Sequence, residues 1–281
     1  MDRRTFMKAA GMAAVGATVL GAAQPARAGE MTGKIKKAVK YGMIKEGKTP
    51  LEKLQILKDL GYDGVEPGYG EVDITALGKA SEATGIEVHG IVRGWTFDDI
   101  NDCIDQAKTV GATSVLIVPR KVDEKMPYAQ NYTETLALMK QAGEHAAKQE
   151  ILLLVENVWS QFLLSPLEMA RYIDEIDNPW VQVYFDIGNV MRYGWPEHWI
   201  PVLGQRIRKL DVKEFSIPKM NDEGLWKGFD VRIGDGSIDW KAVRRELNAL
   251  NYSGWATAEV GGGDRAELAD IAARMDRVFD V

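Results

Sequence analysis

Cysteine and histidine are both scarce in this sequence of 281 residues, which contains one cysteine and three histidines. Because Cys103 has no second cysteine to pair with, no disulfide can form within the chain. The scarcity of cysteine suits a protein that folds in a reducing compartment, where disulfides are rare. We therefore expect the chain to fold in the cytoplasm, even where its final location lies elsewhere.

After residue 28 the sequence lacks any apolar run long enough to cross a bilayer, for which about 20 residues are needed. The first 28 residues place Arg3 and Arg4 ahead of an apolar stretch that ends in the small-residue pattern Ala26-Arg27-Ala28. This arrangement is typical of a Tat-type signal peptide. A membrane anchor or a disordered tail is the alternative, but the apolar stretch is short and rich in glycine and alanine. We expect cleavage after residue 28, export to the periplasm and no stable membrane anchor.

The chain is acidic, with a formal net charge of −6. The predicted signal carries four basic residues and one acidic residue, so its removal would change the net charge from −6 to −9. A protein of this charge is repelled by the phosphates of nucleic acid. We therefore expect a small molecule, and no nucleic acid, as the partner.

The remaining chain lacks linkers, low-complexity tracts and a glycine-rich phosphate loop after its first β-rich run. Instead, short β-rich runs alternate with helical patterns. We expect strands at residues 38–43, 63–67, 86–92, 113–119, 151–157, 181–188, 207–215 and 254–260. We expect helices at residues 49–61, 73–85, 96–111, 132–150, 165–176, 197–204, 238–251 and 265–279. Eight such units predict an α/β fold, a (β/α)8 TIM barrel formed as a single domain by residues 29–281. An open doubly wound sheet is the alternative, against which the count and the missing loop both argue.

Acidic residues occur at the ends of the last four expected strands, where a barrel of this kind carries its chemistry. These residues are Glu156, Asp186, Asp211 and Glu259. A single acid would be explained as a solvated strand end, but four that converge would repel one another. A hard divalent cation with oxygen ligands, such as Mn²⁺ or Mg²⁺, would resolve this repulsion. The pattern therefore predicts a metal site, with Gly188 allowing the loop after Asp186 to turn away.

Four stretches of the sequence resemble a known family: LLLVENVWSQFLLSP, VYFDIGNVMRYG, KLDVKEFS and GSIDWKAVRRELNALNYSGWATAEV. They are similar to the xylose isomerase-like TIM barrels of the sugar phosphate isomerase/epimerase family, which includes the ketose 3-epimerases. The resemblance runs from about Lys40 to the C-terminus. It implies that Glu156, Asp186 and Glu259 are metal ligands and that the two glutamates are also the acid/base pair.

The sequence departs from this family at two positions. Asp211, in DVKE, stands where the family motif H-x-K-D/E has histidine, which raises the ligand charge from −3 to −4 and favours Mn²⁺, Mg²⁺ or Ca²⁺ over Zn²⁺ and Co²⁺. Asn189 stands where the ketose 3-epimerases carry a substrate-binding histidine, and an amide cannot shuttle protons. The few histidines also argue against the DNA-repair endonucleases that share the fold, whose zinc cluster needs several.

We expect a carbohydrate substrate to contact five residues near the strand ends: His89, Trp159, Asn189, Lys213 and Arg232. For His89 the alternative is a satisfied core histidine. For Arg232 the alternative is a surface ion pair with Asp230 or Asp235. Tryptophans in the segments after the strands would give the site flat apolar walls that suit the C–H faces of a sugar.

The expected reaction is metal-dependent isomerisation or epimerisation of a keto sugar, by proton abstraction next to a carbonyl through an enediolate. With a leaving group β to the carbonyl, the same site would act as a 3-keto-glycoside lyase. A catalytically inactive sugar-binding barrel is an alternative of another class. The sequence leaves the sugar and the oligomeric state open, and a homo-oligomer is compatible with it.

Overall fold

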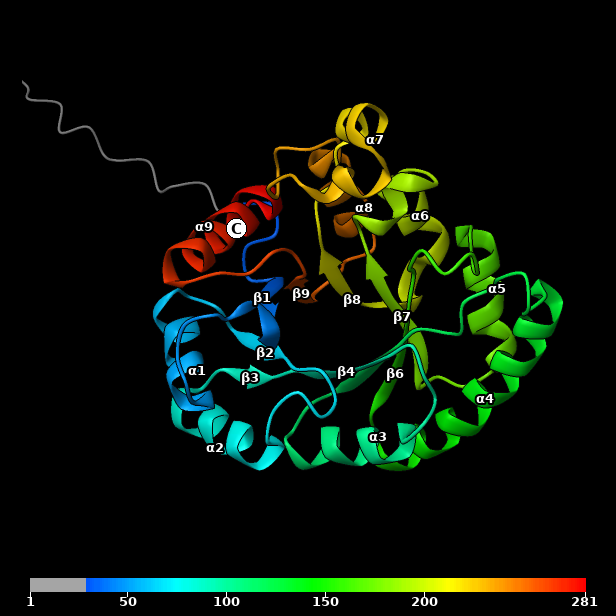
Figure 1. The fold of residues 1–281 in the computed structure, drawn as a ribbon, viewed down its shortest axis with the longest axis horizontal. Coiled ribbons are helices and arrows are strands. Elements are labelled where there is room, and N and C mark those ends of the chain that lie inside the picture. Colours follow the sequence, from blue (N-terminus) through cyan, green and yellow to red (C-terminus); the bar gives the residue numbers. More distant parts are fainter. Residues whose placement is uncertain (1–28) are drawn as a thin grey trace, which may run out of the picture.

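A computed structural model describes residues 29–281 (Figure 1). The Tat-type signal predicted for residues 1–28 lies outside the described residues. Within the described part of the chain, no helix is both long and apolar enough to cross a membrane.

The strands of the described chain form one parallel sheet that curves into a nearly closed barrel (Figure 1). Their order in the sheet is β3-β2-β1-β9-β8-β7-β6-β5-β4. The strands are β1 (Ile35–Lys40), β2 (Gly64–Glu66), β3 (Glu87–Val88), β4 (Gly90–Gly94), β5 (Ser114–Ile117), β6 (Leu152–Glu156), β7 (Val181–Asp186), β8 (Ile207–Val212) and β9 (Gly254–Ala258). This arrangement confirms the predicted barrel.

One predicted strand, residues 86–92, is divided into β3 and β4 by a single residue, His89. The His89 N–H donates to the Val65 carbonyl, while the His89 carbonyl accepts from the Thr113 N–H. His89 is therefore the point at which the chain changes partner from β2 to β5. The two segments together occupy the place of the third barrel strand, between β2 and β5.

Helices surround the barrel (Figure 1). They are α1 (Pro50–Asp59), α2 (Ile74–Thr84), α3 (Ile100–Thr109), α4 (Tyr128–Gln149), α5 (Pro166–Ile176), α6 (Pro196–Leu203), α7 (Ile217–Glu223), α8 (Trp240–Ala249) and α9 (Arg265–Phe279). The sequence pattern predicted all of these except α7. This helix has seven residues and buries none of them, so it leaves no periodic apolar signal in the sequence.

The strands are buried on both faces, as expected for a parallel barrel. On β6, Leu153 and Val155 join the large core between the sheet and the helices. Leu154 instead packs with Leu116 and Tyr184 in a smaller cluster. Because side chains alternate along a strand, Glu156 shares the face of Leu154, and the acidic residue ends the strand on the side of this smaller cluster.

Glu214 fastens the long segment that follows β8 to the barrel. Its buried carboxylate accepts hydrogen bonds from the backbone N–H groups of Phe215, Gly234 and Ile238, at 3.0, 2.7 and 3.4 Å. It also accepts one from the indole N–H of Trp240, at 2.8 Å. Four donors on one carboxylate hold the segment between β8 and α8 in place.

We expect Glu214→Gln to destabilise the fold, because an uncharged amide weakens these bonds and turns N–H groups toward other N–H groups. The loss in free energy of unfolding should be about 2–3 kcal/mol, measured by denaturant titration. Glu223→Gln, at an exposed residue of α7, is the matched control and should change little. Equal stabilities of the two variants would contradict this structural role.

Candidate metal centre

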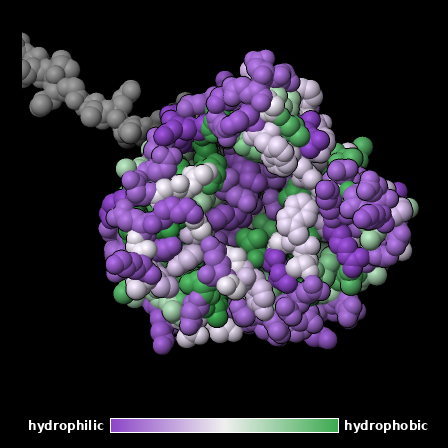
Figure 2. Space-filling model, viewed as in Figure 1, coloured by the Kyte–Doolittle hydropathy of each residue, from purple (hydrophilic) through white to green (hydrophobic). Residues whose placement is uncertain are grey.

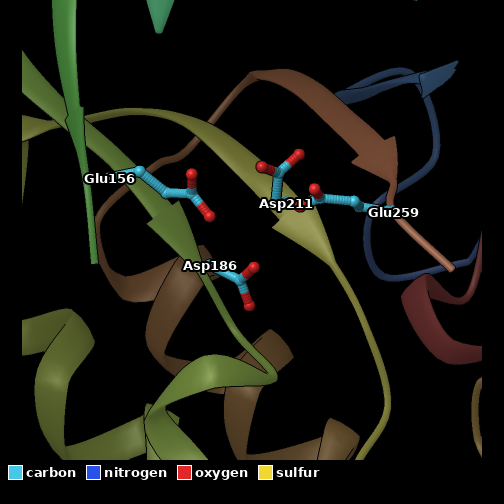
Figure 3. Close-up of side chains that lie close together, drawn as sticks. All are labelled: Glu156, Asp186, Asp211 and Glu259. Atoms are coloured by element: carbon cyan, nitrogen blue, oxygen red, sulfur yellow. The ribbon is translucent and has the colours of Figure 1, made fainter. Parts of the chain in front are cut away.

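Four carboxylates meet at the C-terminal ends of neighbouring strands (Figure 3). They are Glu156 on β6, Asp186 on β7, Asp211 on β8 and Glu259 directly after β9. One oxygen from each residue lies within 4.8 Å of those from the other three. The two aspartates are adjacent in the β7/β8 register and fully buried, whereas the Glu259 side chain is 38% exposed. The acidic residues that the sequence places at the ends of four expected strands therefore do lie together in the structure.

Two lysines reach into this cluster. Lys213 Nζ lies 2.6 Å from Asp186 Oδ2 and 2.9 Å from Glu259 Oε2. Lys40 Nζ, at the end of β1, lies 2.9 Å from Asp211 Oδ1 and 2.5 Å from Glu66 Oε2. The two ammonium groups thus contact four carboxylates, and Glu156 is a fifth that neither lysine contacts, so the carboxylates outnumber the ammonium groups.

Several carboxylate oxygens in the cluster have no hydrogen bond. Asp186 Oδ2, Asp211 Oδ1 and Glu259 Oε2 are buried without a hydrogen-bond partner among the described residues. Each lies close to a lysine ammonium, but at angles outside those of a hydrogen bond. The ammonium groups offset the charge of these oxygens but leave lone pairs with which they can bind a further partner. A set of hard oxygen donors with spare lone pairs fits Mn²⁺, Mg²⁺ or Ca²⁺.

The pKa values of the two glutamates in the cluster are shifted in opposite directions. Burial, reinforced by the neighbouring Glu259, raises the pKa of Glu156 well above its usual value. Burial would also raise the pKa of Glu259, but Lys40 and Lys213 outweigh it and lower this pKa. A pair of carboxyl groups whose environments separate their pKa values is suited to act as acid and base. Burial likewise raises the pKa of both aspartates.

Asn189 links two of these carboxylates. Its backbone N–H donates to Asp186 Oδ1 at 2.8 Å. Its side-chain Nδ2 donates to the Asn157 carbonyl at 3.0 Å and lies 3.4 Å from Glu156 Oε1. The amide predicted to contact substrate is therefore engaged with protein groups that border the cluster.

Trp159 lies beside Asn189, whose carbonyl accepts a hydrogen bond from the indole N–H at 2.8 Å. The half-buried Trp159 ring packs against Phe229 and the exposed Trp226, with ring centroids 4.9 and 4.8 Å apart. The guanidinium of Arg192 lies 4.9 Å from the Trp159 ring centroid. An aromatic surface therefore adjoins the residues that hold Glu156.

Gly188 has a different role from the predicted one. Its φ angle of −75° is accessible to any residue, so the turn does not require glycine. A Cβ at this position would instead lie 2.5 Å from the Lys213 Cβ. The missing side chain lets the backbone pass close to Lys213 and leaves this lysine free to bridge Asp186 and Glu259.

His89 lies in the interior of the barrel, which corrects the expectation of substrate contact in favour of the core alternative. Its Nε2 is 3.1 Å from Thr257 Oγ1 and its Nδ1 is 3.1 Å from Lys209 Nζ. The ring stacks on Trp255 with centroids 4.3 Å apart. Burial, together with the nearby Lys209 charge, lowers the pKa of His89 well below its usual value, so the imidazole is neutral and fully engaged.

Arg232 makes an ion pair, which was the alternative to substrate contact, but its partners are not the acids that the sequence suggested. Its guanidinium lies 2.5 Å from Asp270 and 3.3 Å from Glu267, both on α9. These contacts border a groove of about 320 Å³ between residues 229–233 and α9. The predicted partners Asp230 and Asp235 instead pair with Lys227 and with Arg274 and Arg277, respectively.

Two residues at the site were missed by the reading of the sequence. Lys40 is the last residue of β1 and Glu66 is the last residue of β2. Glu66 lies near the end of the strand predicted at residues 63–67, so the search for acidic strand ends would have found it if it had included this strand. Lys40 lies inside the strand predicted at residues 38–43 and is not acidic, so that search could not have found it. In the view along the barrel the surface is hollowed at its centre and lined there by hydrophilic residues (Figure 2).

The four carboxylates gather at the C-terminal ends of the strands of a parallel α/β barrel, which is where TIM-barrel enzymes carry their active sites. Residues 54–277 match the family described as xylose isomerase-like TIM barrel, and the chain therefore belongs to this family.

The comparisons also identify relatives of known name. L-ribulose-5-phosphate 3-epimerase UlaE of Escherichia coli (strain K12) is 24% identical over 265 residues, covering 82% of this chain and 91% of the relative. The solved structure of 3-keto-D-glucoside 4-epimerase YcjR from E. coli has a TM-score of 0.74 at 15% identity, covering 88% of this chain and 100% of that one. The structure of an L-ribulose 3-epimerase has a TM-score of 0.72 at 15% identity, covering 86% and 94%. The likeness to the two structures confirms the fold.

We expect the purified protein to bind about one divalent ion per chain, with Mn²⁺ or Mg²⁺ raising its melting temperature because the ion binds the folded state. Asp186→Ala should abolish this shift, whereas Glu144→Ala, at an exposed acid on α4, should retain it. Metal analysis and thermal melts with and without added ion would measure both. A melting temperature that no divalent ion changes would exclude the site.

Proposed function

We propose that this protein is a divalent-metal-dependent isomerase or epimerase that acts on a keto sugar. The observation that carries the proposal is the convergence of Glu156, Asp186, Asp211 and Glu259 in a barrel of this family. The names of the relatives support it, because a 3-epimerase of L-ribulose 5-phosphate and a 4-epimerase of a 3-keto-D-glucoside both act at a carbon next to a carbonyl.

The two glutamates are the acid and the base of the proposed reaction. Glu156 and Glu259 approach the cluster from opposite sides (Figure 3). Lys213 holds Glu259 in its ionised form, so this carboxylate removes the proton from the carbon next to the carbonyl. Glu156, whose pKa is raised, returns a proton from the other side, which inverts the carbon.

The four carboxylates would hold the divalent ion, which supplies electrostatic stabilisation of the negative charge that develops on the carbonyl oxygen. Asn189 fixes the positions of Glu156 and Asp186 relative to one another through its contacts to both. The aromatic surface of Trp159, Trp226 and Phe229 excludes water and suits the C–H face of a sugar. The carboxylates would thus hold the ion, Asn189 would position two of them, and the aromatic surface would contact the sugar.

Two observations bear on the substrate, and they favour different classes of sugar. The curated relative UlaE is named for a phosphorylated sugar. The signal peptide predicted for residues 1–28 would place this chain outside the cytoplasm, where sugar phosphates are scarce, and thus favours a free or oxidised keto sugar or a keto-glycoside. An NMR screen of ketoses, ketose phosphates and 3-keto-glycosides with Mn²⁺ would decide between these classes.

Turnover in D₂O should place solvent deuterium at the carbon next to the carbonyl, because a carboxylic acid exchanges its proton with water between turnovers. NMR or mass spectrometry of the product would detect the label. A product without deuterium would indicate a hydride shift and exclude this mechanism. An epimer keeps every atom of the substrate, whereas the lyase alternative would release an alcohol or sugar and leave an unsaturated ketone.

Glu156→Gln and Glu259→Gln should each lower turnover by roughly 10²–10⁴-fold, the usual contribution of one general acid or base. Glu223→Gln, at an exposed residue, serves as the control. Because both glutamates are also candidate ligands, metal content must be measured on the same samples. Near-normal turnover in both metal-loaded variants would rule out the assigned roles.

A further inference from the structure

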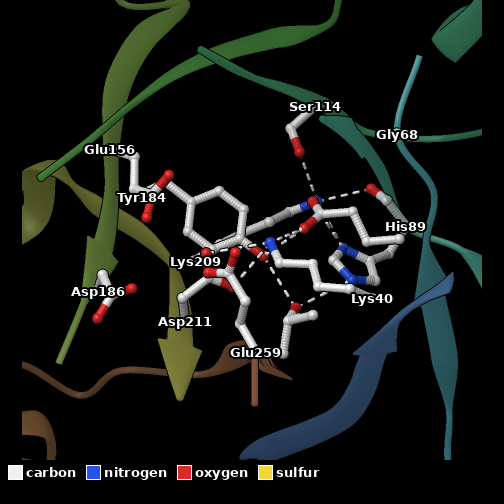
Figure 4. A network of polar contacts seen from close by, with 12 residues as sticks. Lys40, Gly68, His89, Ser114, Glu156, Tyr184, Asp186, Lys209, Asp211 and Glu259 are labelled. Atoms are coloured by element: carbon white, nitrogen blue, oxygen red, sulfur yellow. Dashed lines mark hydrogen bonds and ion pairs between the residues drawn. The ribbon is translucent and has the colours of Figure 1, made fainter. Parts of the chain in front are cut away.

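Lys40 occupies an unusual place for a lysine, inside the end of the barrel with its side chain only 14% exposed. Its Nζ donates to Glu66 Oε2 at 2.5 Å and to Asp211 Oδ2 at 3.0 Å (Figure 4). It also lies 5.0 Å from the centroid of the Tyr184 ring. The ammonium group therefore connects a residue of the metal cluster with a carboxylate that lies outside it.

Glu66 binds the Lys40 ammonium from within the barrel. Its side chain is fully buried, and its Oε2 also accepts a hydrogen bond from the Tyr184 hydroxyl at 3.1 Å. The Tyr184 hydroxyl is in turn 2.8 Å from Thr257 Oγ1. A Cβ on Gly90 would lie 2.4 Å from Glu66 Oε1, so glycine at this position leaves the space that the carboxylate fills. The position of the Lys40 ammonium is thus determined by packed groups of the barrel interior (Figure 4).

The Lys40 ammonium lies against both oxygens of Asp211. Its Nζ donates a hydrogen bond to Oδ2 at 3.0 Å and lies 2.9 Å from Oδ1, which has no hydrogen-bond partner in the described structure. Lys40 therefore fixes the rotation of the Asp211 carboxylate. The two side chains bear opposite charges and are in contact, so the pair has little net charge. An ion bound at this place would therefore meet an oxygen donor whose charge Lys40 has already offset.

We propose that Lys40 is a positioning residue of the metal site, which orients Asp211 and offsets its charge so that a fourth carboxylate can serve as a ligand. The proposal rests on the proposed function, since it requires the carboxylate cluster to bind a divalent ion. Lys40 then determines, through Asp211, that the site is built from oxygen ligands alone and takes hard ions such as Mn²⁺ or Mg²⁺.

A double-mutant cycle tests this coupling, with the Mn²⁺ dissociation constant measured by calorimetry and the metal-free melting temperature as a second readout. In the wild-type background, Lys40→Gln should weaken Mn²⁺ binding by about 10- to 100-fold, although it removes a positive charge, because Asp211 loses its orientation. In the Asp211→Asn background the same change should strengthen Mn²⁺ binding, since only the repulsion by Lys40 remains to be removed. Lys36→Gln, on the same strand at an exposed pair with Glu87, is the control and should leave the dissociation constant unchanged.

Each outcome of the double-mutant cycle either supports or contradicts the role proposed for Lys40. Effects of Lys40→Gln that are equal in the two backgrounds would overturn the proposal, because Lys40 would then act on the ion independently of Asp211. If Lys40→Gln alone does not fold but the double variant does, the coupling with Asp211 is supported. If neither folds, Glu66 is the essential partner and the proposal is wrong. A wild-type protein that binds no divalent ion would instead refute the proposed function.

Discussion

Repulsion between carboxylates at one end of the barrel is the constraint on which the rest of the site depends. Glu66, Glu156, Asp186, Asp211 and Glu259 lie close together, and burial removes most of the water that would screen them. Such a group stays ionised only if positive charge or hydrogen-bond donors reach it. The structure supplies these from strands distant in the sequence, through lysines on β1 and directly after β8.

The small residues near the site follow from the same constraint. Gly188 lets Lys213 approach Asp186, and Gly90 leaves the space for Glu66, which in turn holds Lys40. Deeper in the barrel, Lys209 donates to the His89 carbonyl, Ser114 and Thr113, at 2.6, 2.7 and 3.1 Å. Burial lowers the pKa of Lys209 to about 7, so this amine carries its charge only in part near neutral pH. The interior is therefore polar where many barrels pack branched apolar side chains.

Periodicity and strand-end position were sufficient to predict the barrel and the four carboxylates, because both depend on local pattern and on the known geometry of parallel sheets. They could not place His89, since a residue near a strand end is either at the surface or in the core depending on how far that strand extends. They also missed Lys40, whose role depends on a partner 171 positions away in the chain. The helix α7 left no pattern, because none of its residues is buried.

The polar interior has a consequence for stability. A barrel filled with charged and hydrogen-bonded groups gains less from apolar burial than one filled with leucine and valine, and here the small inner cluster consists of Leu116, Val118, Leu154 and Tyr184. The remaining stability in this region depends on the balance of charges. An ion held by Glu156, Asp186, Asp211 and Glu259 would relieve the repulsion that limits this balance, and its binding energy would add to the free energy of folding. The arrangement proposed for proton transfer on a sugar would thus also couple the stability of the barrel to a bound ion.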